Sequence, residues 1–178
     1  MTSAATTSAS HTLTASPENV HWGYFDAKLK PHLTIESGET VTLNCVSGGP
    51  GEVGHRTDLL PEHRAILEKV KPYLGPHILT GPVAVRGAKA GQVLEVRIKS
   101  IDLHYDWGYN MIRPLTGALP DDFKEMRLIH IPLDRARMVG TMSLAESTTP
   151  RCWQIKGAAR CIIRGSVSQT AAFSATPK

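Results

Sequence analysis

The sequence has few of the features that mark several large protein classes. Its 178 residues contain three cysteines, and their spacing matches neither a zinc finger nor a disulfide framework. No apolar run approaches the roughly 20 residues that a transmembrane helix needs. We therefore expect a reducing, cytoplasmic setting and no membrane partner.

The short motifs of common catalytic mechanisms are also missing. The chain has no Gly-x-Ser-x-Gly element, no phosphate-binding loop that ends in Gly-Lys-Ser or Gly-Lys-Thr, and no His-x-x-x-His pair. No serine or cysteine stands in the sequence signature of a nucleophile with a partner base. Composition and spacing alone indicate a β-rich domain with clustered histidine, aspartate and aromatic residues.

Positive charge is concentrated at one end of the chain. The formal net charge is +4, yet residues 1–150 carry 15 Lys or Arg against 16 Asp or Glu. Residues 151–178 carry five basic residues and no acidic one. The basic isoelectric point therefore describes the tail, and we do not expect nucleic acid as a partner.

Composition divides the chain into three parts. Residues 1–17 are rich in Ser, Thr and Ala and are expected to form a flexible leader. Residues 18–145 contain the periodic segments and are expected to form one β-rich domain. Residues 146–178 show no sustained period, so a basic, disordered tail is predicted.

Two-residue periodicity indicates a mainly β fold. The alternating segments are 33–36, 40–46, 83–85, 93–101 and 126–133. The first two flank Ser37-Gly38-Glu39, which predicts a hairpin. A short helix is expected within Leu59–Leu74, as an insertion between strands rather than a core element. The predicted fold is a β-sandwich or barrel-like domain with a short helical insertion.

Three clusters of polar and aromatic residues are candidates for chemistry. They are His21-Trp22-Gly23-Tyr24-Phe25-Asp26, Gly75-Pro76-His77-Ile78-Leu79-Thr80-Gly81-Pro82 and His104-Tyr105-Asp106-Trp107-Gly108-Tyr109-Asn110. In the last of them His104 and Asp106 share strand parity, so both side chains could leave one face of a sheet. Each cluster has a structural alternative, because aromatic side chains mostly pack in cores and Asp or Asn often bonds to turn backbone.

Other histidines give a weaker signal. His32, His55 and His104 are expected to be surface histidines without a further role.

The clusters, taken in order, resemble the amino-terminal half of the acetamidase/formamidase family. The matching blocks are His21–Ala27, Leu33–Thr42, Ser47–Pro50, Gly75–Val96, Asp106–Asn110 and Ile131–Leu133. The resemblance covers about residues 18–142, and the segment after Thr149 does not share it. It implies a β-rich domain that is incomplete relative to the family fold.

The resemblance implies that a short aliphatic amide, such as formamide or acetamide, is hydrolysed to the carboxylate and ammonia. It also implies a divalent metal ion, zinc or alternatively calcium, that polarises the carbonyl and activates water. Full-length relatives are expected to be homo-oligomers. By residue type within the matching motifs, the expected metal ligands are His21 and His77, the catalytic residues Asp26 and Asp106, and the substrate contacts Trp22, Trp107 and Asn110.

Two functions stay open on the sequence. The first is amide hydrolysis, impaired here because the acid- and histidine-rich block of the family's second half is absent from the chain. The alternative is a non-catalytic β-rich module for binding or oligomerisation.

Overall fold

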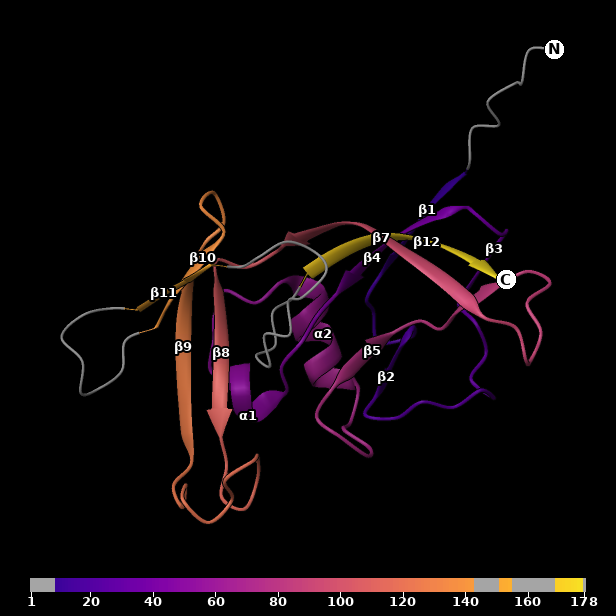
Figure 1. The fold of residues 1–178 in the computed structure, drawn as a ribbon. Coiled ribbons are helices and arrows are strands. Elements are labelled where there is room, and N and C mark those ends of the chain that lie inside the picture. Colours follow the sequence, from indigo (N-terminus) through magenta and orange to yellow (C-terminus); the bar gives the residue numbers. More distant parts are fainter. Residues whose placement is uncertain (1–8, 143–150, 155–168, 178) are drawn as a thin grey trace.

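The fold is mainly β, as predicted, in a computed structural model that describes residues 9–142, 151–154 and 169–177 (Figure 1). Its strands are β1 (Ser10–Thr14), β2 (Val20–Trp22), β3 (Leu33–Ile35), β4 (Thr40–Cys45), β5 (Ile78–Thr80), β6 (Val83–Val85), β7 (Leu94–Leu103), β8 (Trp107–Ile112), β9 (Arg127–Asp134), β10 (Val139–Met142), β11 (Arg151–Gln154) and β12 (Gln169–Pro177). The helices of these ranges are α1 (Pro50–Val53) and α2 (Pro61–Lys69).

The strands of the described ranges form separate sheets and do not close into a barrel. Two sheets have four strands each, in the orders β1-β4-β12-β7 and β11-β10-β9-β8, and two have two strands each, β2-β5 and β3-β6. In Figure 1, β8 and β9 stand at the left and β7 and β12 at the upper right, with both helices between them.

The predicted strands around Ser37-Gly38-Glu39 form, but the predicted hairpin is wrong. β3 pairs in parallel with β6, and β4 lies between β1 and β12. The turn itself is present, since Gly38 has φ +86° and the Glu39 N–H donates to the Glu36 carbonyl at 3.2 Å. A turn reverses the direction of the chain over a few residues, but it does not fix which strands pair. In this fold β3 and β4 each pair with other strands. Ile35 and Val41 are both buried.

Both ends of the chain contribute strands, which differs from the predicted flexible leader and disordered tail. β1 pairs in parallel with β4, and the ring of His11 lies 2.8 Å from the Glu39 carboxylate. β12 pairs antiparallel with both β4 and β7. The composition of these segments did not predict the strands β1 and β12. Strands are held together by backbone hydrogen bonds, which form without apolar side chains. Residues 1–8, 143–150, 155–168 and 178 lie outside the described residues.

Two hydrophobic clusters form the core around the helices. The first contains Ala15, Trp22, Val46, Ile66 and Ile78, and the second contains Val53, Leu59, Tyr105, Trp107 and Tyr109. Leu67 of α2 packs against both clusters, and Ile66 is fully buried. The prediction that this helix lies outside the core is therefore wrong.

β7 leaves an apolar stripe exposed. Leu94, Val96 and Ile98 fall on one face of the strand at alternate positions, and each is about half exposed, at 49–52%. Neither helix in the described ranges is long and apolar enough to cross a membrane.

Candidate functional site

The two predicted metal ligands lie on one face of the β2–β5 sheet. Trp22 pairs with Ile78 across these antiparallel strands, and both point into the first core cluster. His21 therefore leaves the opposite face, because side chains alternate along a strand. The Gly23 N–H donates to the His77 carbonyl at 2.8 Å, which continues the register and places His77 on the same face as His21.

The ring of His21 lies at the end of a row of three aromatic rings. Its ring meets Tyr24 edge-on at 5.3 Å between centroids, and Tyr24 meets Tyr73 in the same manner at 5.5 Å. The Nδ1 atom of His21 is buried and has no hydrogen-bond partner within the described part of the chain. His77, by contrast, is exposed.

The described residues do not complete the expected metal site. Asp26 is exposed and accepts the Lys28 N–H at 2.8 Å, so it acts as a turn residue. Among the described residues, no three His, Cys, Asp or Glu side chains are grouped so that they could hold a metal ion. His21 and His77 thus have no third donor grouped with them among the described residues.

The second group of predicted residues lies around β8, away from the first. β7 ends at Leu103, so the expected shared strand face of His104 and Asp106 does not exist. The Asp106 carbonyl accepts the Leu133 N–H at 2.6 Å, while its side chain is exposed. Asn110 is half-buried within β8.

The two predicted tryptophan contacts belong to different cores. Trp22 is buried in the first hydrophobic cluster, and Trp107 is buried in the second. The structure therefore does not bring the predicted substrate contacts into one site.

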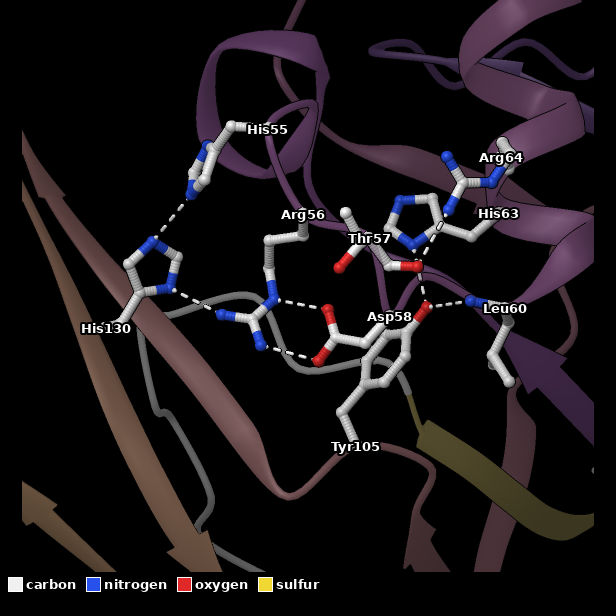
Figure 2. Close-up of polar contacts among 9 residues, drawn as sticks. All are labelled: His55, Arg56, Thr57, Asp58, Leu60, His63, Arg64, Tyr105 and His130. Atoms are coloured by element: carbon white, nitrogen blue, oxygen red, sulfur yellow. Dashed lines mark hydrogen bonds and ion pairs between the residues drawn. The ribbon is translucent and has the colours of Figure 1, made fainter.

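A different set of polar side chains meets beside Trp107. We call the group formed by His55, Arg56, Asp58, Trp107 and His130 the His55–His130 cluster. Figure 2 shows its members other than Trp107. His55, Arg56 and Asp58 stand on the loop between α1 and α2. His130 lies on β9 opposite Tyr109, so it leaves the face of the β8–β9 pair that also carries Trp107.

Arg56 is the central member of this cluster. Its Nε and Nη2 atoms bind the two Asp58 oxygens at 2.8 and 2.6 Å, a bidentate pair. Its guanidinium also lies 3.9 Å from the centroid of the Trp107 ring, a cation–π contact. The hydrogen bond from Arg56 is the main reason that the pKa of Asp58 is lowered. Aspartate and indole together fix the plane of the guanidinium.

The two histidines contact each other directly. The Nε2 atoms of His55 and His130 are 3.2 Å apart, and the rings meet edge-on at 79°. Nη1 of Arg56 reaches Nδ1 of His130 at 3.4 Å. Burial lowers the pKa of His130, and the positive charge of Arg56 and the neighbouring His55 lower it further, against the opposing effect of Asp58. These effects favour the neutral form of His130.

A second histidine network lies deeper, at the base of the same loop. His63 of α2 is fully buried, and its Nε2–H donates to the Gly48 carbonyl at 3.0 Å. The Tyr105 hydroxyl donates to Nδ1 of His63 at 3.2 Å and accepts the Leu60 N–H at 2.8 Å. Burial lowers the pKa of His63 and raises that of Tyr105. Every polar atom of this network has a partner, as a structural role requires.

A buried carboxylate completes the polar interior of the loop. Glu52 of α1 is 7% exposed, and its Oε2 atom accepts the Gly49 N–H at 2.9 Å. Its Oε1 atom binds the Arg113 guanidinium. A Cβ at Gly49 would lie 2.9 Å from the Glu52 carboxylate and 3.3 Å from the Trp22 ring, so a larger residue there would force these side chains to shift.

The sequence analysis pointed to Trp107 and to the segment that contains Tyr105, but it missed the other residues of these networks, although some signals exist. His63 stands three, four and seven residues before Ile66, Leu67 and Val70, which is the spacing of one buried helix face. His55 is exposed, as expected of a surface histidine, but it has a defined partner. That partner is 75 residues away in the chain, and no local pattern links the two.

Comparison with known proteins gives a consistent family assignment. A sequence model of the Acetamidase/Formamidase family matches residues 8–138. A search of curated proteins found no match to this sequence.

Solved structures share the fold. They include a predicted acetamidase/formamidase from Thermoanaerobacter tengcongensis (TM-score 0.60, 13% identity, 94% of this chain and 69% of that chain covered) and an acetamidase from Bacillus halodurans (0.58, 14%, 94% and 70%). An acetamidase from Yersinia enterocolitica matches with TM-score 0.55 and 23% identity over 82% of this chain and 44% of that chain. Because the family model covers well over half of the sequence, the chain belongs to the Acetamidase/Formamidase family.

Proposed function

We propose that this protein hydrolyses short aliphatic amides, formamide or acetamide, to the carboxylate and ammonia. The observation that carries the proposal is the family match over residues 8–138. In the reaction the water oxygen bonds to the carbonyl carbon, the C–N bond breaks, and the nitrogen leaves as ammonia with a proton taken from water. The family match supports linear amides as the substrate class. An assay of ammonia release tests this part of the proposal.

The His55–His130 cluster is the described group whose chemistry suits this reaction best. Amide hydrolysis places negative charge on the former carbonyl oxygen, and fixed hydrogen-bond donors stabilise that charge. The cluster combines two imidazoles in contact with each other and an arginine that is held in place by an aspartate and an indole. The segment around His21 offers an imidazole beside the partly buried ring of Tyr24, and His77 is an exposed imidazole.

The test is the release of ammonia from formamide and acetamide by the purified chain. We expect slower turnover than that of a solved family member assayed beside it, because no three His, Cys, Asp or Glu side chains of the described residues are grouped so that they could hold a metal ion. Folded protein that releases no ammonia from either amide would support the alternative, a non-catalytic binding or oligomerisation module.

Metal dependence is a separate part of the proposal. We predict a divalent ion, zinc or alternatively calcium, with His21 and His77 among its donors. Metal content should be measured for the parent chain and for the His21→Ala/His77→Ala double variant after dialysis against each ion. Equal metal content in the two proteins would show that these histidines are not ligands, whatever the amidase result.

A further inference from the structure

We propose that His55 and His130 form a neutral imidazole pair of fixed tautomers, which presents the Nδ1–H group of His55 to the carbonyl oxygen of a small primary amide. The tautomers follow from the contacts of the His55–His130 cluster alone. The identity of the ligand rests on the proposed function.

The first step is the tautomer of His130. A guanidinium has only N–H donors and no acceptor, so Nδ1 of His130 must accept the hydrogen bond from Arg56 at 3.4 Å. A neutral imidazole has one acceptor and one N–H. The proton of His130 therefore sits on Nε2.

The second step is the tautomer of His55. With Nε2 of His130 protonated, it donates across the 3.2 Å gap to Nε2 of His55. His55 accepts at Nε2, so its own proton lies on Nδ1. If His55 instead donated to Nε2 of His130, the proton of His130 would lie on Nδ1. That N–H would then face the N–H donors of Arg56, which is unfavourable.

The arrangement resists protonation. A proton added at Nε2 of His55 would turn two N–H groups toward each other at 3.2 Å. A proton added at Nδ1 of His130 would face Arg56, whose orientation is fixed by Asp58 and Trp107. The groups facing His130 are thus Arg56, Asp58 and His55, and the lowered pKa of His130 agrees with a neutral ring.

The same contacts argue against His130 as a metal ligand through Nε2. Ligation at that nitrogen requires the proton on Nδ1, where metal-bound histidines usually donate to a carboxylate or carbonyl. In this cluster Nδ1 meets an arginine, which can only donate. The pair is therefore a hydrogen-bonding device.

The remaining donor of the pair is the Nδ1–H of His55. His55 is exposed, and its described hydrogen bond uses Nε2. A neutral N–H donor binds a carbonyl oxygen without an ion pair and strengthens its hold as negative charge develops there. Neutral primary amides present such an oxygen, so they are the ligand class that the pair fits.

The tautomers can be measured directly by NMR of the full chain with ¹⁵N-labelled histidine. We expect His130 to carry its proton on Nε2 and His55 on Nδ1 at neutral pH, with resonances assigned from His55→Ala and His130→Ala. Arg56→Met should release His130 into a mixture of tautomers. Should Arg56→Met fail to fold, Asp58→Asn provides the second comparison, since it loosens the arginine without removing a donor. A proton on Nδ1 of His130 in the parent chain would overturn the proposal.

The role of His55 is tested by turnover. His55→Ala should lower the turnover number for acetamide by about tenfold to a hundredfold, toward the loss seen when an oxyanion donor is removed. His55→Gln, which keeps an N–H donor, should recover part of that loss. His32→Ala, at an exposed histidine outside the cluster, should match the parent. Unchanged turnover in His55→Ala would overturn the donor role.

The two proposals fail differently. If the parent chain releases no ammonia, amide hydrolysis is wrong, and a shift of the His55 Nδ1–H signal on addition of acetamide alone decides the binding role. If ammonia is released but the tautomers are reversed, the imidazole pair is wrong and the amidase proposal stands.

Discussion

At the scale of single residues, His63 ties three segments together through both ring nitrogens. It joins α2 to Gly48 directly and to the Tyr105 segment through the phenol hydroxyl. A cation at this position would lose the hydrogen bond that Tyr105 donates and would lack solvent. The neutral form of the ring is thus required for the loop to keep its shape.

This requirement predicts a loss of stability in mild acid. An unfolded histidine titrates near pH 6.5, whereas the pKa of folded His63 is lowered. Both states are neutral well above pH 6.5, and below it the unfolded chain binds a proton that the folded chain does not. The free energy of unfolding should therefore fall by up to about 1.4 kcal/mol per pH unit below pH 6.5, until the folded pKa is reached. Urea unfolding at pH 8 and pH 5.5 measures this.

Two variants isolate the contribution of His63. The lowered pKa of His130 also reduces stability in mild acid. The contribution of His63 is therefore the difference between the parent and His63→Gln in how far the free energy of unfolding falls with pH. His63→Gln should be less stable than the parent at pH 8. Its free energy of unfolding should fall less than that of the parent between pH 8 and pH 5.5. His32→Gln, an exposed position, is the control. An unchanged pH dependence in His63→Gln would contradict the assignment.

Glu52 gives a second prediction at this scale. Glu52→Ala leaves the buried Gly49 N–H and the Arg113 guanidinium without their acceptor, which should cost about 1–3 kcal/mol. The matched control is Glu36→Ala, because the ion pair of Glu36 with Arg86 is largely exposed and such pairs contribute under about 1 kcal/mol. Equal losses in chemical denaturation would show that the burial of Glu52 does not matter.

At the scale of elements, α2 gains its stability from packing rather than from its own sequence. A nine-residue helix is too short to be stable alone in water. Its fully buried Ile66 lies in the first hydrophobic cluster. We expect Ile66→Ala to lower the free energy of unfolding by about 2–5 kcal/mol. Glu68→Ala, on the exposed face of the same helix, should change it by less than about 0.5 kcal/mol. Urea titrations followed by far-UV circular dichroism compare them.

The elements were predictable where the signal is local. Alternation located β3, β4, β6, β7 and β9, and helical spacing located α2. Strand pairing was not predictable in the same way, since β3 and β4 each pair with segments distant in sequence. β1 was missed because Ser and Thr dominate its surroundings, and composition then resembles a flexible segment.

The candidate site follows the same division. The family resemblance indicated His21 and His77 as metal ligands, and these two residues lie on one face of a sheet. It also indicated Trp22 and Trp107 as substrate contacts, but they lie in different hydrophobic clusters. The His55–His130 cluster depends on a contact between a loop and a distant strand. No property of either histidine's neighbours along the chain specifies that contact.

At the scale of the whole molecule, the apolar stripe of β7 affects behaviour in solution. Leu94, Val96 and Ile98 expose contiguous apolar surface, and such surface lowers solubility. The Val96→Thr/Ile98→Thr variant should stay soluble at higher ammonium sulfate concentration than the parent, with a similar melting temperature. Val41→Thr, at a fully buried position of β4, should instead lower the melting temperature. A loss of stability in the double variant would mean that the stripe is covered.

The place of Leu67 between the two hydrophobic clusters bears on how the protein melts. Because Leu67 packs against both hydrophobic clusters, the stability of each cluster depends on the other. The two clusters should therefore unfold together. A calorimeter should accordingly record a single heat-absorption peak, whose van't Hoff enthalpy equals the measured heat. Trimming the shared side chain, as in Leu67→Ala, should broaden or split that peak, which would separate the melting of the region around Trp22 from that around Trp107.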